Sequence, residues 1–384
     1  MSKSVFPHFQ VILSLLASLH LATAVLAHSQ APIAPTGLVS AVTPHAPAFF
    51  SLDINQITTP WPLIPFGSYR FWDNGARWDE VNSASGTFSW TVMDEWTSKL
   101  AVNGIKDGLY ELSATPVWAS PDPNDMSCDY ADEGFPGSCY APIDLNADGT
   151  GSNQIWRLWV EAVGSHLKSG PVHIVAWGIW NEFTRQPNTG SPEIAWKGTN
   201  LQMVRMAEDA RCILTGRGSI TSTGETCQQV LATVGRSSPI DTTALILTPS
   251  AGWDSVIIAG NWKTYYATPG ASRAAEAFAL HDYTSSANLE IGLAQDFRSH
   301  LSPSDQTKPL WITEGAWSPG SIHDPNLQAQ FLTQTYVGFA QLGIARFYWY
   351  SYDNTMWGTL WTVGGGLTPA GQAYAAAYKS MVGK

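Results

Sequence analysis

The sequence predicts an α/β fold, a (β/α)8 TIM barrel that forms a single domain over residues 48–384. Three observations lead to this prediction. Apolar, β-prone runs alternate with stretches of helical periodicity from residue 48 onward. There are eight such runs, the number that closes a barrel of parallel strands. No Gly-x-Gly-x-x-Gly loop follows an early run, which argues against an open, nucleotide-binding sheet.

The expected elements follow one another in strict alternation for most of the chain. Each expected strand is a short segment rich in aliphatic and aromatic residues, and the strands are placed at residues 49–54, 69–72, 107–111, 173–180, 244–248, 277–281, 310–313 and 346–350. The expected helices have apolar residues at helical spacing, and they are placed at residues 90–103, 153–168, 200–215, 272–276, 289–301, 325–342 and 369–382. No internal repeat or linker to a second domain interrupts this order.

Composition limits the partners of the protein. The chain has a net charge of -11 and only 13% charged residues, but it contains 18 tryptophans. It lacks the Lys/Arg cluster that a nucleic-acid-binding face requires, so nucleic acid is excluded as a partner. Acidic polysaccharides are also disfavoured. The composition favours a neutral, hydroxylated partner such as a polysaccharide or oligosaccharide, bound by a monomer.

The first residues are typical of a signal peptide. Lys3 precedes a mostly apolar stretch at 11–26, and small residues lead to a cleavage site after Ala27. The alternative, an uncleaved membrane anchor, requires a longer apolar run. Residues 28–47 are rich in Pro, Ala and Thr and are expected to be a flexible lead-in. We therefore expect a secreted or periplasmic protein with no integral membrane span after cleavage.

Four cysteines are consistent with export. Three disulfide connectivities are possible. The two local pairs, Cys128–Cys139 and Cys212–Cys227, are favoured because each brackets a loop rich in Gly, Pro or Ser. A metal site made of all four thiolates is the alternative, but the chain has no Cys-x-x-Cys spacing.

One segment resembles the first half of a calcium-binding loop. Asp144, Asn146 and Asp148 have the required spacing, and a glycine follows. The twelfth position is Ile155, where such a loop needs a bidentate glutamate. A turn that caps the helix starting near Asn153 is the better interpretation, and no metal is expected here.

Two glutamates carry the functional prediction. Glu182 ends the run Val-Ala-Trp-Gly-Ile-Trp-Asn-Glu after the fourth strand, and Glu314 ends Pro-Leu-Trp-Ile-Thr-Glu after the seventh. A carboxylate seldom lies at the end of a buried strand without a partner or a function, because its desolvation is costly. Working residues of such barrels lie at these strand ends, and cleavage of a glycosidic bond needs two carboxyl groups. The alternative is a structural ion pair at each strand end.

Several motifs in this order resemble the retaining glycoside hydrolases of clan A, most closely family 39, the family of β-xylosidases and polysaccharide endoglycosidases. They are Trp-Asn-Glu at 180–182, Thr-Glu at 313–314, Tyr-Arg-Phe-Trp-Asp-Asn-Gly-Ala-Arg-Trp at 69–78, Leu-Tyr-Glu-Leu-Ser-Ala-Thr-Pro-Val-Trp-Ala-Ser at 109–120 and His-Asp-Tyr at 281–283. The resemblance covers residues 48–380. It implies Glu314 as nucleophile, Glu182 as acid/base and a reaction with retention.

The resemblance also implies roles for the neighbours of these two glutamates. Arg70 would lie beside Glu314 and favour its ionised form, a role compatible with a structural ion pair. Asn181 would bind the sugar 2-hydroxyl, unless it serves only the turn after the strand. Tyr283 would donate a hydrogen bond to the nucleophile, and His281 would lie near the acid/base, although an Asp or Tyr elsewhere could fill either role.

Tryptophans at strand ends are candidates for stacking on sugar rings, because a flat aromatic face matches the C–H face of a pyranose. Trp349 is expected to form the floor of the central sugar site, and the further candidates are Trp118, Trp317 and Trp357. Trp177, Trp180 and Trp311 lie within strands and are expected partly in the core. Packing alone is the alternative for each of them.

The predicted function is therefore a secreted retaining β-glycosidase that hydrolyses a polysaccharide, with no organic cofactor and no catalytic metal. Endo action is favoured because the sequence ends soon after the eighth strand, without room for the β-sandwich that the β-xylosidases of the family append. An exo-acting β-xylosidase is the first alternative. A non-catalytic carbohydrate-binding barrel is the second, although such a protein would be expected to lose one of the glutamates.

Overall fold

Nine of the strands in the described residues form one parallel sheet that closes into a barrel. The computed structural model describes residues 45–252 and 256–383. In this part of the chain the sheet has the order β5-β4-β3-β2-β1-β9-β8-β7-β6. Strand β5 (Leu245–Ile246) and strand β6 (Ala251–Gly252) are two short pieces that together occupy the position of the fifth barrel strand. A parallel bridge from Leu247 to Ala277, just before β7, closes the ring. The predicted (β/α)8 barrel is confirmed.

The remaining strands coincide with the predicted ones within a few residues. They are β1 (Phe50–Leu52), β2 (Ser68–Phe71), β3 (Asp107–Glu111), β4 (His173–Gly178), β7 (Phe278–Thr284), β8 (Leu310–Trp317) and β9 (Arg346–Trp349). A short antiparallel hairpin, β10 (Trp361–Thr362) and β11 (Gly366–Leu367), follows the barrel. The eighth strand of the barrel is therefore β9.

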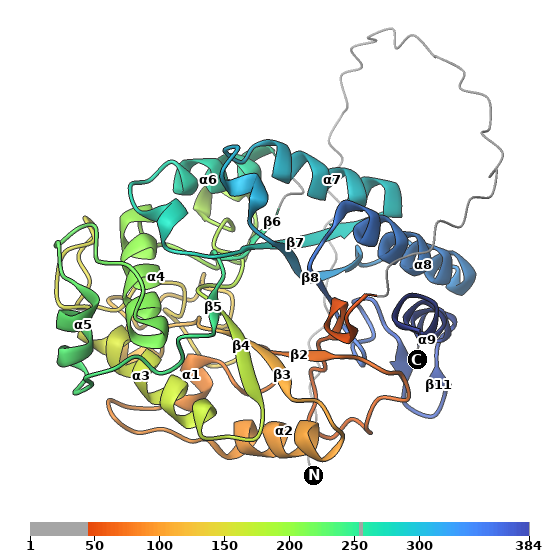
Figure 1. The fold of residues 1–384 in the computed structure, drawn as a ribbon, viewed down its shortest axis with the longest axis horizontal. Helices are drawn as coiled ribbons and strands as arrows, with labels where there is room; N and C mark the ends of the chain where they lie inside the picture. Colours follow the sequence, from red (N-terminus) through yellow and green to blue (C-terminus); the bar gives the residue numbers. More distant parts are fainter. Residues whose placement is uncertain (1–44, 253–255, 384) are drawn as a thin grey trace, which may run out of the picture. The chain divides into compact units, whose positions relative to one another are not determined.

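The helices lie outside the strands (Figure 1), and in the described residues they are α1 (Trp78–Val81), α2 (Thr91–Val102), α3 (Gln154–Lys168), α4 (Asn200–Thr215), α5 (Cys227–Thr233), α6 (Val256–Tyr266), α7 (Ala287–Ser299), α8 (Pro325–Leu342) and α9 (Pro369–Val382). The bounds of α4, α8 and α9 are the predicted ones, because capping residues mark them. Helix α4 starts after a capping box at Thr199 and ends at Gly216, which has a left-handed conformation. None of the described helices combines the length and apolar character of a bilayer span.

One predicted helix is wrong. Residues 272–276 contain only part of a 3-10 turn, Ala271–Arg273, and then lead into β7. The helix of this part of the chain is α6, which sequence periodicity did not reveal. Its Val256 is 91% exposed whereas Trp262 is buried, so its apolar residues do not share one face.

The apolar core has two layers. The side chains inside the barrel form a small cluster that includes Leu109, Ala176, Ala279 and Trp311. A much larger cluster fills the space between the sheet and the helices. Tyr348 of β9 belongs to the inner cluster and Trp349 to the outer one, because successive side chains of a strand point to opposite faces.

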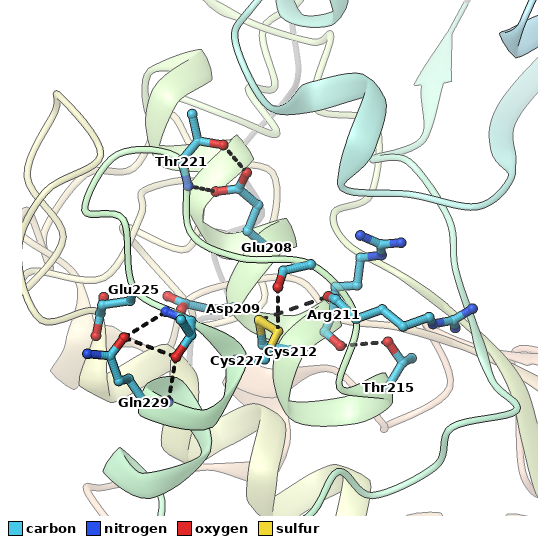
Figure 2. Close-up of a disulfide and its surroundings, with 12 residues drawn as sticks. Glu208, Asp209, Arg211, Cys212, Thr215, Thr221, Glu225, Cys227 and Gln229 are labelled. Carbon is cyan, nitrogen blue, oxygen red and sulfur yellow. Dashed lines mark hydrogen bonds between the residues drawn. A yellow bond between two sulfur atoms is a disulfide. The ribbon is translucent and has the colours of Figure 1, made fainter.

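Two disulfides tie loops to the barrel. Cys128 is bonded to Cys139, and Cys212 is bonded to Cys227, which is the local connectivity among the three possible ones. Figure 2 shows the second bond, which joins α4 to the start of α5. Beside it, Glu208 of α4 accepts hydrogen bonds from the backbone and hydroxyl of Thr221. The connection between the two helices is thus held by covalent and polar contacts together.

The loop that resembles a calcium site caps a helix. The Asp144 carboxylate accepts hydrogen bonds from the backbone N–H groups of Gln154 and Ile155, the first residues of α3, at 2.5 and 3.2 Å. Asp148 accepts from Thr150. Asp144 thus satisfies open N–H groups at the N-terminus of α3 and interacts favourably with the positive end of its dipole, while Asp148 orders the turn before the helix.

A buried acidic pair in the outer layer predicts a pH effect on stability. Burial raises the pKa of Glu290 on α7 well above its ordinary value, and the nearby Asp282 raises it further. Glu290 is therefore protonated in the folded protein where the unfolded chain has lost the proton. The contribution of Glu290 to the free energy of unfolding is fully present below the pKa that the group has in the unfolded chain, about 4.3. As the pH rises above that value, the contribution falls by about 1.4 kcal/mol per pH unit until the pH passes the pKa of Glu290 in the folded protein.

Replacing Glu290 with Gln is expected to remove this loss, since Gln is neutral at every pH. Urea unfolding of both proteins between about pH 4 and pH 7 measures the effect. The variant should gain stability relative to wild type as the pH rises. Parallel stability curves would show that Glu290 has no shifted proton equilibrium.

Candidate active site

A cavity of about 540 Å³ opens at the carboxyl ends of the barrel strands. Its walls come from the segments that follow β2, β3, β4, β8 and β9 and from the C-terminal parts of β7 and β8. They contain Trp72, Asp73, Arg77, Tyr130, Glu133, Asn181, Glu182, Arg185, Glu193, Tyr283, Glu314, Ser318, Pro319, Tyr350 and Trp357. This end of the barrel is where the fold assembles working residues from several strands. Both candidate glutamates lie in this cavity.

Glu182 and Glu314 meet across the cavity. One carboxylate oxygen of each and a ring nitrogen of His281 lie within 4.8 Å of one another. Irregular strand register next to His281 and around Glu314 helps to direct these side chains. Glu182 has a left-handed backbone with φ of 46°, and its N–H donates to Ser250 at 2.9 Å. Retaining glycosidases hold their two carboxyl groups about 5–5.5 Å apart and inverting ones hold them farther apart, so an oxygen–oxygen approach within 4.8 Å agrees with the retaining geometry.

Glu314 is surrounded by hydrogen-bond donors. One carboxylate oxygen accepts from Nη1 of Arg70, and the other accepts from the Tyr283 hydroxyl at 2.8 Å. Burial raises the pKa of Tyr283 well above its ordinary value, and the charge of Glu314 raises it further, so this hydroxyl keeps its proton. These two donors, one of them the guanidinium of Arg70, hold the Glu314 carboxylate in place.

Arg70 lies at the centre of a buried polar cluster. Its Nη2 donates to Oδ1 of Asn181 at 2.8 Å and lies 3.4 Å from Glu111, while its Nη1 lies 3.6 Å from Asp53. Burial raises the pKa of both Asp53 and Glu111, against the lowering effect of Arg70. Because the Asn181 oxygen is held by Arg70, its amide nitrogen is the atom that remains for a ligand. Arg70 thus orders Glu314 and Asn181 together.

Glu182 has a cationic neighbour that the sequence motifs did not indicate. Oε2 of Glu182 lies 2.7 Å from Nη1 of Arg185, and Oε1 lies 3.2 Å from Nδ1 of His281. Burial raises the pKa of Glu182, but Arg185 and His281 outweigh this and hold it well below its ordinary value. His281 also lies 3.4 Å from Glu314, so its Nδ1 is shared between the two carboxylates.

The cluster of Glu182, His281 and Glu314 also has the composition of a metal site, but its contacts do not favour one. Each of the four carboxylate oxygens already faces a donor, and two of these donors are guanidinium groups. Their positive charge opposes a cation at the same place. A second group, Asp125 with Cys128 and Cys139, has no thiolate because the cysteines are bonded to each other.

The prediction of Trp349 as the floor of the sugar site is wrong. Its side chain is 0% exposed and packs against Trp317 and against Phe331 and Tyr336 of α8. The next residue, Tyr350, lines the cavity instead. The strand alternates its faces, so an error of one residue exchanges the cavity for the outer core.

Of the other tryptophan candidates, one lines the cavity and two do not. Trp357 lines the cavity and packs edge-on against Tyr283. Trp317 is buried beside Trp349, and Trp118 donates to the backbone of Asn82 and does not line the cavity. Burial contradicts Trp317 as a stacking platform, whereas Trp118 is half-buried and its role stays a prediction. Trp72 is an aromatic wall residue that the motif at 69–78 contained but the tryptophan candidates omitted.

A third carboxyl group in the cavity is Asp73, which sequence reasoning also missed. It accepts hydrogen bonds from the Tyr350 hydroxyl and from Asn55 at 2.7 Å. Burial raises the pKa of Asp73 to about 6, although Tyr350 lowers it. The sequence could have indicated Asp73 as a site residue, because it lies directly after β2, the strand that also supplies Arg70.

The barrel has structural relatives but no match by sequence. Neither a protein-family model nor a curated protein sequence matches the chain. Similar structures include a glucosidase from Croceicoccus marinus (12% identity, TM-score 0.57), a family 39 glycoside hydrolase from the gut symbiont Bacteroides cellulosilyticus WH2 (14%, 0.51) and a GH39 β-xylosidase from Caulobacter crescentus (16%, 0.52). The alignments cover 87%, 88% and 88% of this chain and 68%, 65% and 72% of those chains. The likeness establishes a fold that this chain shares with glycoside hydrolases, including the family that its motifs resemble.

Proposed function

We propose that this protein is a retaining β-glycosidase that hydrolyses a neutral polysaccharide, with Glu314 as nucleophile and Glu182 as acid/base. The observation that carries the proposal is the approach of these two carboxylates, within 4.8 Å, in a cavity at the working end of the barrel. The family resemblance of the motifs and the shared fold point in the same direction.

The contacts of the two carboxylates assign the steps. Ionised Glu314, held by Arg70 and Tyr283, attacks the anomeric carbon while Glu182 gives a proton to the departing glycosidic oxygen. In the second step Glu182 takes a proton from water, which displaces Glu314 from the sugar. Asn181 donates its amide to the sugar 2-hydroxyl, a contact that strengthens in the transition state. No step requires a cofactor.

A neutral substrate fits the charge of the cavity wall. The wall contains five carboxyl groups, Asp73, Glu133, Glu182, Glu193 and Glu314, against the two guanidinium groups of Arg77 and Arg185. An acidic sugar would therefore meet repulsion. The wall also includes the aromatic side chains of Trp72, Tyr130 and Trp357, which lie on segments after different strands and suit several sugar units.

The decisive experiment is covalent trapping. The purified protein is first assayed with aryl β-glycosides and neutral polysaccharides, and the sugar it accepts is then offered as its 2-fluoro derivative. Peptide mass spectrometry is expected to find the label on Glu314, and product NMR is expected to give the β-anomer first. A label on another residue, or an α-product, would contradict the assignment.

Endo action is proposed as the finer function and has its own test. Chain-length analysis of early products from a polysaccharide is expected to give oligosaccharides of mixed length. Release of xylose alone from chain ends would favour the alternative, an exo-acting β-xylosidase. Binding of glycans without any cleavage would favour the non-catalytic barrel.

We also propose that the protein is exported. The two disulfides are consistent with an oxidising compartment. The predicted signal peptide (1–27) and most of the predicted lead-in (28–47) lie outside the described residues. N-terminal sequencing of the mature protein from its native source tests cleavage after Ala27.

A further inference from the structure

The turn after Glu182 directs a second charged side chain onto its carboxylate. The backbone N–H of Arg185 donates to the carbonyl of Glu182 at 2.8 Å, so the chain reverses between the two residues. Nη1 of Arg185 then lies 2.7 Å from Oε2 of Glu182. The two side chains are 23% and 18% exposed, so water screens this ion pair only in part.

The other end of the guanidinium contacts two further carboxylates. Nη2 of Arg185 lies 2.7 Å from Glu193 and 3.2 Å from Asp129. Asp129 is next to the cystine of Cys128, and its N–H donates to the carbonyl of Ile194 at 3.2 Å. Arg185 is therefore shared between Glu182 on one side and a carboxylate pair on the other, and it keeps partners if it leaves Glu182.

The ion pair conflicts with the first chemical step. A general acid must carry a proton when the substrate is cleaved, whereas a guanidinium in direct contact favours the ionised carboxylate. The charged and titratable groups around Glu182 come from several elements. They are Arg185 in its own turn, His281 and Tyr283 on β7, Glu314 on β8, Asp129 and Tyr130 before α3 and Glu193 after β4. Of these, Arg185 is the only permanent cation in the described residues that contacts Glu182.

We propose that Arg185 is a positioning residue that decides when Glu182 carries a proton. In the free protein it holds Glu182 ionised. When the leaving-group side of the substrate enters the cavity, Arg185 turns to Asp129 and Glu193, and Glu182 takes a proton from solvent that it then gives to the glycosidic oxygen. This inference rests on the proposed glycosidase function.

The carboxyl groups of Asp129 and Glu193 can hold Arg185 after it leaves Glu182. Burial raises the pKa of Asp129 to about 7, Arg185 lowers it, and the charges of Glu182 and Glu193 raise it. A full approach of Arg185 would stabilise the ionised form of Asp129 and so offset the lost contact with Glu182. The cystine and the contact with Ile194 hold the Asp129 segment in place for this role.

The test compares pH profiles of kcat/KM and kcat, because the first reports groups of the free protein and the second reports groups of the complex. The substrate is the phenyl β-glycoside of the sugar that wild type accepts, since its poor leaving group needs the proton of Glu182. In wild type the alkaline limb of kcat/KM is expected at lower pH than that of kcat. In Arg185→Met the kcat/KM limb is expected to rise by about one pH unit or more and to coincide with the kcat limb.

A second variant is expected to move the limb of kcat in the opposite direction. Asp129→Asn removes a carboxylate that receives Arg185 in the complex, so Arg185 stays on Glu182 and the alkaline limb of kcat falls to lower pH, toward that of kcat/KM. Because this variant keeps Arg185, it tests the proposal even if Arg185→Met does not fold. Arg236→Met is the matched control: Arg236 makes a similarly exposed ion pair with Glu161, 3.1 Å away, and the limb should stay in place.

The outcomes separate the inference from the function on which it rests. Wild-type limbs that coincide, or an Arg185→Met profile that is scaled down but not displaced, would overturn the role of Arg185 and leave the glycosidase proposal intact. If wild type cleaves no glycoside at all, the proposed function fails and the inference fails with it. Opposite displacements in Arg185→Met and Asp129→Asn would support both.

Discussion

Replacing Glu314 with Gln is expected to lower kcat/KM by about 10⁴-fold or more on every substrate, because an amide cannot attack the anomeric carbon. The loss should be the same for good and poor leaving groups, since every substrate forms the same bond between Glu314 and the anomeric carbon. Steady-state kinetics with a series of aryl β-glycosides measures it. Glu161→Gln, the same change at a partly exposed glutamate that pairs with Arg236, is the control for handling and folding.

The anomeric form of a rescued product tests the same role independently. Glu314→Ala leaves a space on the face of the sugar opposite the leaving group, and azide is expected to enter it and form the α-glycosyl azide. If azide yields only the β-product from this variant, Glu314 is not the nucleophile. Thermal unfolding of the variant checks that Arg70, which still has Asp53 and Glu111 nearby, keeps the buried cluster folded.

Glu182→Gln is expected to give a loss that depends on the leaving group. With phenyl or sugar leaving groups kcat/KM should fall by about 10²–10⁴-fold, because the proton that assists departure is missing. With dinitrophenyl glycosides it should fall little, since that oxygen leaves as a weak base. A plot of log kcat/KM against the leaving-group pKa gives the slope directly, and the slope should be steeper than in wild type.

Equal losses on both kinds of substrate would contradict the acid role of Glu182. Azide provides the complement here too: with Glu182→Ala it should attack the glycosyl-enzyme intermediate and give the β-glycosyl azide. The two glutamate variants thus predict azides of opposite configuration, which no purely structural role for either residue would produce.

Much of the barrel could be predicted because its signals are local. Each strand is a short apolar run, and helices such as α8 have a cap, Asp324, a first-turn proline, Pro325, and a terminal glycine, Gly343. Glu182 and Glu314 could be predicted from the sequence for a related reason. The desolvation of a carboxylate at the end of an apolar strand is costly, so a glutamate at such a position indicates a functional role.

The residues that sequence reasoning missed depend on contacts between distant segments. Nothing local distinguishes Trp349 from Tyr350, and only the packing of α8 against β9 decides which of them faces the cavity. Arg185 follows Glu182 by three residues, but its significance depends on Asp129, which a disulfide-bonded loop brings from far along the chain. Contacts between side chains of different loops produce no periodic pattern in the sequence, so they cannot be predicted from it.

The backbone of Glu182 has a consequence for how this protein can change over generations. Its left-handed φ of 46° is unfavourable for a glutamate by about 1–3 kcal/mol, whereas Gly adopts it without penalty and Asn at a reduced one. The proposed acid/base role gives a reason for glutamate at this position in spite of that cost. A descendant that loses the activity is expected to change here to glycine or asparagine, which removes the backbone strain and also the contacts of Glu182 with Arg185 and His281.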